Sequence, residues 1–350
     1  MRAAVMRGPN NLVVDDVSDP VPGPNQILCK TLACGICGSD LHFLRFGQQM
    51  VDLVGEMGMP MRLDLTRDIV MGHEFSAEVL EIGPDTSAAV KPGDVVVSFP
   101  AMVTDFTKLE DVEPIGAYSN VYNGAYAERL LVSSLLTMPV PNGLDARFAA
   151  LTEPMAVGVH AVNRSGIKPG DAAVVLGAGP VGLAVVAALK RAGIEPIVAA
   201  DFSPARRALA LRLGAHEAVD PRSEPAIEAW RRIDGARPLV IYEAVGIPGM
   251  LDQAMRDAPR QGRVLVVGAC MESDTVRPMF GVGKELEIRF SFGYDPMEFG
   301  ATLRAIAEGE FDVEAMITGE VGIDGVPDAF EALANPDEHC KILVEPALDG

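Results

Sequence analysis

The sequence contains few cysteines, fewer basic than acidic residues, and no continuous apolar segment of membrane length. Five of its 350 residues are cysteine, whereas a secreted disulfide scaffold carries many more, so we expect a reducing, cytoplasmic compartment. Lysine and arginine number 29 against 49 aspartates and glutamates, which gives a net charge of −20. Because so negative a surface repels phosphate backbones and anionic lipid, nucleic-acid and membrane partners are not expected.

One stretch without charged residues, 172–189, has about the length of a membrane span. It is interrupted by Gly-Ala-Gly-Pro at 177–180, which divides it into a strand, a turn and a helix. We therefore predict a buried strand and helix rather than a membrane span. Residues 1–12 contain no long apolar run, so no targeting segment is expected.

The composition is that of a globular protein, with 49% hydrophobic and 22% charged residues, which excludes a disordered chain or a fibre. A length of 350 residues suits two domains. The first 150 residues are predicted to be rich in β-strands, because short apolar runs are separated by proline and glycine. These runs are Gln26–Leu32, Ala77–Ile82 and Val95–Phe99.

From Asp171 onward the pattern changes, and strands alternate with helices. Strands are expected at 173–176, 197–200, 218–219, 239–244, 263–267 and 286–292, and helices at 181–192, 205–213, 226–233 and 250–258. Repeated βα units with β-branched strands predict an α/β fold class, in which helices cover both faces of a parallel sheet. Two further helices, at 297–308 and 326–334, and a last strand at 341–344 are expected beyond it.

The segment 177–182 fits the pattern G-x-G-x-x-G at the junction of a predicted strand and helix. Gly177 permits the tight turn, Gly179 lets the backbone approach a pyrophosphate, and Gly182 lets the helix and strand pack closely. Pro180 and Val181 complete the turn. The free N–H groups at the helix N-terminus can bind the phosphates, so a dinucleotide site is predicted here despite the acidic composition.

Asp201 ends the next predicted strand, nineteen residues after the last glycine. A carboxylate at this point can accept hydrogen bonds from the adenosine ribose hydroxyls and would repel a 2′-phosphate. The following residue is Phe202 and not arginine, so NAD is predicted in preference to NADP. Arg206, on the next helix, is either a solvated residue or lies over the adenine ring.

The run Cys34–His42 brings two thiols, a hydroxyl, a carboxylate and an imidazole into nine residues. Its C-x-x-C pattern alone suggests a zinc ribbon or a redox pair, but the other cysteines do not form a second pair. His73, Glu74 and Glu153 supply an imidazole and two carboxylates further along the chain. The thiolate of Cys37, the imidazole of His73 and one or two of these carboxylates make a plausible zinc site of three protein ligands, with an open position for water or substrate.

The motifs Cys37-Gly-Ser-Asp-x-His42, Gly-His73-Glu74, Glu153-Pro154 and Gly177-x-Gly-x-x-Gly182, in this order, resemble those of the zinc-dependent medium-chain dehydrogenases. The sorbitol, threonine and related alcohol dehydrogenases are the nearest branch, and the resemblance runs along nearly the whole chain. It implies a GroES-like, β-rich catalytic domain at residues 1–154 and 294–350, with a doubly wound Rossmann domain at 155–293 inserted between its two parts.

The resemblance also implies a role for each matched residue. Cys37 and His73 correspond to zinc ligands, and either Glu74 or Glu153 to the third protein ligand. Asp40 corresponds to the carboxylate that orients the zinc-bound imidazole. Ser39 corresponds to the hydroxyl that takes the substrate proton, and His42 to the imidazole that passes it to solvent.

The implied reaction is hydride transfer between a primary or secondary alcohol and NAD, with zinc acting as a Lewis acid on the alcohol. Within this branch, a polyol or threonine-type dehydrogenase is the second hypothesis. A zinc-free NAD(P)H reductase of the same superfamily and a non-catalytic nucleotide-binding protein are hypotheses outside the branch. A homodimer or homotetramer is expected from the resemblance.

The chain departs from the family at two places. Between Phe75 and Thr152 it contains no cysteine, so we expect one catalytic zinc and no structural zinc. The corresponding lobe, 100–123, would then be held by packing or by a neighbouring subunit. In addition, a Met-rich segment at 45–68, with a short helix expected at 48–56, lengthens the interval between Cys37 and His73. It is interpreted either as a wall of the substrate pocket that favours an apolar or bulky alcohol, or as a surface elaboration.

Overall fold

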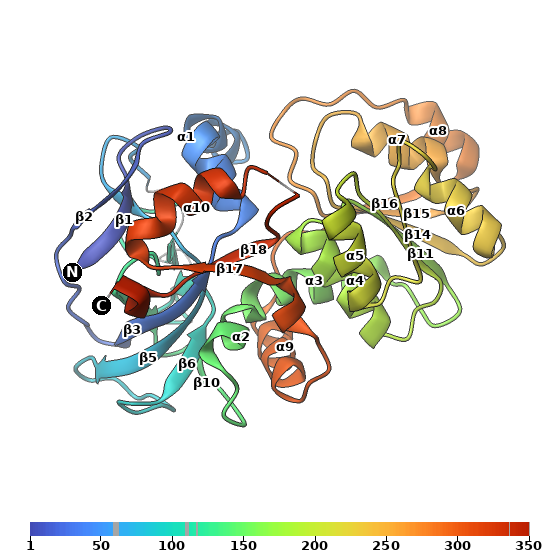
Figure 1. Ribbon diagram of the computed structural model, residues 1–350. Coiled ribbons are helices and arrows are strands. Elements are labelled where there is room, and N and C mark those ends of the chain that lie inside the picture. Colours follow the sequence, from blue (N-terminus) through green and yellow to red (C-terminus); the bar gives the residue numbers. More distant parts are fainter. Residues whose placement is uncertain (59–62, 109–111, 117, 336, 350) are drawn as a thin grey trace.

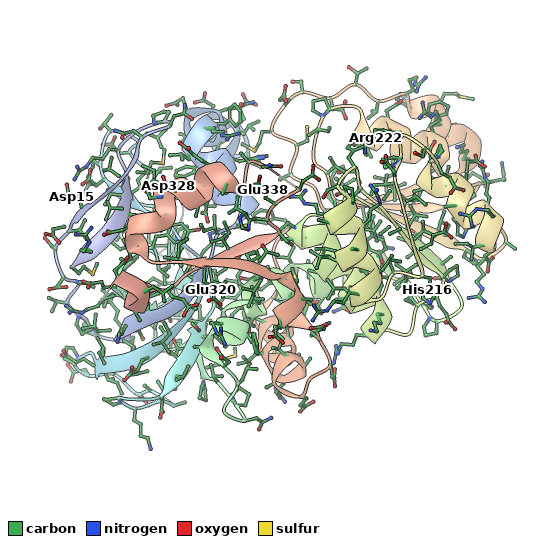
Figure 2. All side chains as sticks on the ribbon, in the orientation of Figure 1. Asp15, His216, Arg222, Glu320, Asp328 and Glu338 are labelled. Carbon is green, nitrogen blue, oxygen red and sulfur yellow. The ribbon has the colours of Figure 1, made fainter. Side chains whose placement is uncertain are left out.

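Two lobes make up the computed structural model, which describes residues 1–58, 63–108, 112–116, 118–335 and 337–349 (Figure 1). The N-terminal strands and the C-terminal segment form one lobe, and the alternating strands and helices of the middle segment form the other. Exposed acidic side chains such as Asp15, Glu320 and Asp328 lie at the surface of the first lobe (Figure 2). Among the described residues, no helix has both the length and the apolar character that crossing a bilayer requires.

The first lobe is built on a seven-stranded sheet with the order β10-β6-β5-β3-β18-β17, in which β9 also pairs with β3. Two smaller sheets, β2-β1-β4 and β7-β8, accompany it. The strands are β1 (Arg2–Met6), β2 (Leu12–Asp16), β3 (Gln26–Gly35), β4 (Ile69–Val70), β5 (Glu74–Ile82), β6 (Val95–Ser98), β7 (Ala101–Met102), β8 (Glu113–Pro114), β9 (Arg129–Ser133), β10 (Thr137–Pro139), β17 (Ile317–Val321) and β18 (Lys341–Val344).

Strand β18 joins the C-terminal segment to this sheet. It pairs antiparallel with β3, with Leu343 opposite Gly35 and Val344 opposite Cys34. All four residues of β18 are buried, including the lysine that begins it. The last strand of the chain therefore lies beside the cysteine motif, about three hundred residues away in sequence.

The second lobe contains six parallel strands in the order β13-β12-β11-β14-β15-β16. Alternate residues of β11 pack into different cores. Ala173 and Val175 belong to the cluster that includes α3 and α4, whereas Val174 belongs to the cluster that contains Trp230 of α6. The predicted parallel sheet with helices on both faces is thus confirmed. Its elements are β11 (Ala172–Leu176), β12 (Ile197–Ala200), β13 (Glu217–Val219), β14 (Leu239–Glu243), β15 (Arg263–Val266), β16 (Glu287–Phe290), α3 (Thr152–Ser165), α4 (Pro180–Arg191), α5 (Pro204–Leu213), α6 (Ala226–Ile233), α7 (Met250–Asp257) and α8 (Pro278–Lys284).

Helix α1 (Gly38–Glu56) differs from the short helix expected at 48–56. It begins directly after Cys37, its N-cap, and runs for 19 residues with a non-helical break at Phe46. The break and the glycine at 47, which packs against Leu65, interrupt the periodic pattern, so the first half of the helix was not predicted. The remaining helices are α2 (Ala146–Ala150), α9 (Pro296–Ala307) and α10 (Val326–Ala332).

Candidate metal centre and dinucleotide site

Three of the four predicted metal ligands lie together. The thiol of Cys37, the imidazole of His73 and the carboxylate of Glu74 place ligand atoms within 4.8 Å of one another. The sheet accounts for this arrangement, because β3 ends just before Cys37, β5 begins at Glu74, and the two strands pair with Gly35 opposite Glu74. Residues from two distant motifs thereby meet at one end of an antiparallel pair.

Asp40 faces the imidazole of His73 from the first turn of α1. Its Oδ1 atom lies 3.4 Å from Nδ1 of His73, and its Oδ2 atom accepts hydrogen bonds from the hydroxyl of Tyr126 at 2.7 Å and the backbone N–H of Cys37 at 3.3 Å. Asp40 is buried. The predicted orienting carboxylate is therefore next to the imidazole, and Tyr126, which the sequence did not point to, anchors it.

The charge balance of this group suits a cation. Burial lowers the pKa of His73, but the charges and hydrogen bonds of Asp40 and Cys37 together raise it more, so the net pKa lies well above the usual value. Nδ1 of His73 and Oδ1 of Asp40 are buried and have no hydrogen-bond partner among the described residues. A thiol, an imidazole and a carboxylate whose ligand atoms lie this close together form a donor set that zinc fits, since a metal ion displaces protons from its ligands.

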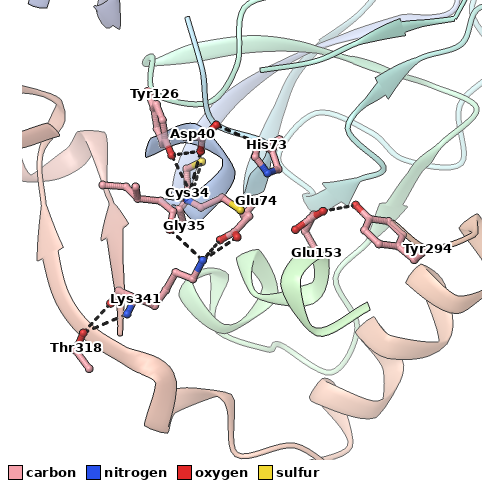
Figure 3. Close-up of polar contacts among 12 residues, drawn as sticks. Cys34, Gly35, Asp40, His73, Glu74, Tyr126, Glu153, Tyr294, Thr318 and Lys341 are labelled. Carbon is pink, nitrogen blue, oxygen red and sulfur yellow. Dashed lines mark hydrogen bonds and ion pairs between the residues drawn. The ribbon is translucent and has the colours of Figure 1, made fainter. Parts of the chain in front are cut away.

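Glu74 is also paired with a lysine that no sequence motif singled out. Nζ of Lys341 donates to both carboxylate oxygens of Glu74, at 2.7 and 2.6 Å, and to the carbonyl oxygen of Ile36 at 3.0 Å (Figure 3). Both side chains are buried, with 0% and 1% exposed. A Cβ on Gly35 would lie 2.1 Å from Glu74 Oε2, so only glycine leaves room for this carboxylate. The sequence gives one indication of this pair: a lysine is the first residue of an apolar strand, and fully buried lysines need a partner.

Glu153, the fourth predicted ligand, lies in the first turn of α3 outside this compact group of described residues. The hydroxyl of Tyr294 donates to Glu153 Oε1 at 2.8 Å. Figure 3 shows the carboxylate of Glu153 on the side of Glu74 away from Lys341. Burial raises the pKa of Glu153 to about 7, and the nearby carboxylate of Glu74 adds to this. Of the two carboxylates expected as the third ligand, the geometry favours Glu74.

The raised pKa of Glu153 predicts a pH dependence of stability in the metal-free protein. Between its usual pKa of 4.5 and the folded value of about 7, the folded state holds a proton that the unfolded state releases, so the free energy of unfolding falls as pH rises. Glu153→Gln removes the titrating group. We therefore expect the free energy of unfolding of the variant to fall over this pH range by about 3 kcal/mol less than that of the native chain. Urea unfolding of both proteins from pH 4.5 to 8 measures it, and parallel pH curves would contradict the expectation.

The two predicted proton-transfer residues share one face of α1. Ser39 is half-buried and His42 is exposed, three positions later along the helix, and residues at this spacing are neighbours on a helix surface. The ring of His42 contacts that of Phe46 edge-on, at 6.3 Å between centroids. The two residues therefore lie on one face of a helix whose N-cap is Cys37, and exposure increases from Ser39 to His42.

The glycine motif occupies the turn from β11 to α4, as predicted. Gly177 adopts a φ of +89°, which disfavours other residues. A Cβ on Gly182 would lie 1.9 Å from the carbonyl oxygen of Gly177, so close packing at this point also requires glycine. Helix α4 begins at Pro180, with Gly179 as its N-cap, and its first N–H groups point out of the turn where an anion can bind.

Asp201 directly follows β12 and reaches back to the glycine turn. Its two carboxylate oxygens accept from the backbone N–H groups of Ala178 and Ser203, both at 2.8 Å. Arg206 lies beside the turn, since its Nη1 atom is 3.9 Å from the position of a Cβ on Gly179. Its Nε atom is buried and lacks a hydrogen-bond partner among the described residues.

The fold also brings Arg222 to this end of the site, where no sequence motif had placed it. Arg222 Nη2 donates to the carbonyl oxygen of Phe202 at 3.0 Å, and its guanidinium lies over the Phe202 ring. Arg207 donates to the carbonyl oxygen of Asp201. Both arginines pair with Asp220, so part of their positive charge is already neutralised.

The lobe without cysteines contacts the inserted Met-rich segment. The side chain of Asn120 donates to the carbonyl oxygens of Asp64 and Asp68, at 3.1 and 3.3 Å, and accepts from the N–H of Asp64 at 2.6 Å. Gln49 of the segment donates to the carbonyl oxygen of Met271 in the other lobe at 2.8 Å. Met59 and Met61, by contrast, lie outside the described residues.

Comparison with known proteins matches two parts of the chain to families of known description. Residues 23–142 match a family described as alcohol dehydrogenase GroES-like domain, and residues 180–308 match one described as zinc-binding dehydrogenase. The chain is 32% identical to (R,R)-butanediol dehydrogenase of Bacillus subtilis over 353 residues, which cover 99% of this chain and 100% of the relative. It is 27% identical to sorbitol dehydrogenase of Bacillus subtilis, over 99% and 97% of the two chains. A crystal structure of a zinc-binding dehydrogenase from Sinorhizobium meliloti 1021 bound to NADP superimposes with a TM-score of 0.83, at 28% identity and 99% coverage of both chains.

Proposed function

The chain belongs to the zinc-dependent medium-chain dehydrogenases and is an alcohol dehydrogenase, and on this premise we propose that it transfers hydride between a primary or secondary alcohol and NAD. The observation that carries the proposal is the compact group of Cys37, His73 and Glu74. The fold class expected from the motifs, a GroES-like domain with a Rossmann domain, is confirmed. A vicinal diol or polyol is the second candidate substrate, supported by relatives named butanediol and sorbitol dehydrogenases.

We propose that Cys37, His73 and Glu74 hold one catalytic zinc ion, with Glu153 close by. When bound, zinc supplies a Lewis acid that makes the substrate hydroxyl more acidic at neutral pH. Asp40 keeps the imidazole of His73 oriented toward the metal group, because its Oδ1 atom faces Nδ1 of His73. A structural zinc is not proposed, since residues 75–152 lack cysteine.

The proton of the substrate hydroxyl leaves through residues of α1. Ser39 accepts this proton at Oγ and gives up its own, and His42, exposed three positions later, releases a proton to solvent. When bound, the nicotinamide ring accepts the hydride. The glycine turn and Arg206 bind the pyrophosphate side of the dinucleotide, and Asp201 binds the adenosine ribose.

Asp201 is expected to decide between the two cofactors. Replacing Asp201 by Asn removes a carboxylate that accepts from ribose hydroxyls and repels a 2′-phosphate, while the side-chain shape is kept. Because a hydrogen bond to a charged group contributes about 1.5–3 kcal/mol, kcat/KM with NAD should fall about 10- to 100-fold, and kcat/KM with NADP should rise. Initial rates with both cofactors, together with a melting temperature as the folding control, measure this. If the ratio of kcat/KM with NAD to kcat/KM with NADP were unchanged in the variant, Asp201 would not be the residue that distinguishes the two cofactors.

We further propose the domain limits 1–154 with 294–350, and 155–293. Pairing of β18 with β3 supports them, because the C-terminal strand completes the N-terminal sheet. A cytoplasmic location is proposed because all five cysteines are free thiols. A homodimer or homotetramer is proposed from the family membership.

Metal analysis and a substrate screen test the proposed function. Near one zinc per chain, with NAD reduction on alcohols or polyols, is the expected result. Absence of zinc, with reduction of an activated double bond by NADPH, would instead indicate the zinc-free reductase. Nucleotide binding without turnover of any alcohol would indicate a non-catalytic protein. Shortening the inserted segment at 45–68 and repeating the screen tests its proposed contribution to substrate selectivity.

A further inference from the structure

Tyr294, in the short segment between β16 and α9, fixes a carboxylate beside the metal group. Its hydroxyl donates to Oε1 of Glu153, in the first turn of α3, at 2.8 Å. Two aromatic rings hold this tyrosine. The ring of Tyr294 stacks on Phe299, with centroids 5.5 Å apart and planes at 22°, and meets Phe99 edge-on at 5.1 Å. The packing therefore keeps the phenol hydroxyl at one place.

Helix α9, which begins two residues after Tyr294, holds α3 at a second point. Nδ2 of Asn163 in α3 donates to Oε1 of Glu298 in α9 at 2.8 Å, and Nδ1 of His160 lies 2.6 Å from Oε2 of Glu298. The helix that carries Glu153 and the segment that carries Tyr294 are thus fixed to each other, so the carboxylate of Glu153 has a defined position.

The second carboxylate oxygen of Glu153 is left for a ligand. Oε2 makes no hydrogen bond or ion pair with the described residues, and it is not enclosed by protein. The residue as a whole is half-buried. A carboxylate oxygen in this position can accept a hydrogen bond from a hydroxyl group that enters the site.

A substrate can approach the metal group from the side of Glu153. On other sides, Lys341 occupies Glu74 through two hydrogen bonds, and Asp40 faces Nδ1 of His73. Figure 3 shows Glu153 across the Glu74 carboxylate from Lys341. A substrate whose reacting hydroxyl binds at the metal group from this side lies next to Oε2 of Glu153.

We propose that Tyr294 is a positioning residue that holds Glu153 to accept a hydrogen bond from a second substrate hydroxyl, adjacent to the one that reacts. The inference rests on the proposed function and deepens it, because it names vicinal diols as the preferred substrate class. Tyr294 occupies Oε1, and the second hydroxyl donates to Oε2. A simple alcohol has no hydroxyl for Oε2, and a site built to bind a hydroxyl discriminates against the analogue that lacks it.

Two substrates with the same carbon skeleton, 2,3-butanediol and 2-butanol, test the inference. In the native enzyme we expect kcat/KM with NAD to be about 10-fold or more higher for the diol. Tyr294→Phe keeps the aromatic packing but lets the carboxylate of Glu153 rotate, so KM for the diol should rise about 5-fold. Because the second hydroxyl is bound equally in the ground state and the transition state, kcat should change less than about 2-fold. Neither constant for 2-butanol should change by more than that.

Two further measurements separate positioning from packing and from metal binding. In a Glu153→Ala background, Tyr294→Phe should change KM for the diol less than about 2-fold, because no carboxylate is left to position. The zinc dissociation constant of Tyr294→Phe, measured by competition with a chelator, should equal the native value, because Glu153 here binds the substrate and not the metal. Weaker zinc binding by this variant would overturn the inference.

Tyr242→Phe is the matched control. Tyr242 is also buried, and its hydroxyl shares a hydrogen bond with Oγ of Ser165 at 2.7 Å. This change should leave the preference for the diol as it is in the native enzyme, and the melting temperature of each variant shows that it folds. If the native enzyme had no preference for the diol, or Tyr294→Phe kept it in full, the inference alone would be wrong. Native enzyme that oxidises no alcohol would overturn the proposed function, and this inference with it.

Discussion

Replacing Cys37 by serine is expected to abolish zinc retention and to lower kcat/KM for alcohol oxidation about 1000-fold or more. The thiolate is the softest donor of the group that also contains His73 and Glu74, and zinc prefers sulfur and nitrogen ligands. Loss of a Lewis acid removes several kcal/mol of charge stabilisation, and each 1.36 kcal/mol corresponds to a tenfold rate change. Zinc analysis after dialysis and initial rates with NAD measure the two effects.

Cys34→Ala provides the matched control, because Cys34 belongs to the same C-x-x-C pattern. Its side chain is fully buried and interacts with the carbonyl oxygen of Gly35, and burial raises the pKa of its thiol well above the usual value. We expect the control to keep one zinc per chain and near-native activity, at a modest cost in stability. If Cys37→Ser retained zinc and full activity, the proposed metal site would be wrong.

The nucleotide half of the fold could be predicted closely from the sequence, because its signals are local. The helix 226–233 and the strand 197–200 agree with the structure residue for residue. The glycines at 177–182 depend only on the turn that contains them, where a positive φ and close packing exclude larger residues. Parallel strands between helices also leave few arrangements open.

The metal group could be predicted only in part, because its surroundings come from segments that are distant in sequence. Cys37, His73 and Glu74 were predicted as ligands from their motifs, and the structure brings them together. Their partners Tyr126 and Lys341 could not be identified, because the pairing of β18 with β3 is a long-range contact with no local pattern. The residues that position the metal ligands were thus harder to predict from the sequence than the ligands themselves.

The buried pair of Lys341 and Glu74 leads to the largest expected effect on stability. Burial lowers the pKa of Lys341, but the charge and hydrogen bond of Glu74, together with the thiols of Cys37 and Cys340, raise it more, so the ammonium stays charged. Lys341→Met keeps most of the side-chain volume yet leaves the carboxylate buried without its partner. Breaking a buried pair in this way costs about 3–5 kcal/mol, so the free energy of unfolding of the metal-free variant, measured in urea, should be lower than the native value by that amount. Lys30→Met, an exposed change on β3, should remain within about 0.5 kcal/mol of the native value.

A second comparison separates this pair from a general packing defect. Adding Glu74→Gln to Lys341→Met removes the unpaired charge, so most of the lost stability should return if the charge is the cause. Zinc should stabilise Lys341→Met more than it stabilises the native chain, because in the variant the ammonium of Lys341 no longer competes with the metal ion for the carboxylate of Glu74. Urea unfolding of the metal-free and zinc-loaded forms gives both differences. Equal stabilisation of the two proteins by zinc would mean that Glu74 does not bind the metal, and Glu153 would then be the better candidate for the third ligand.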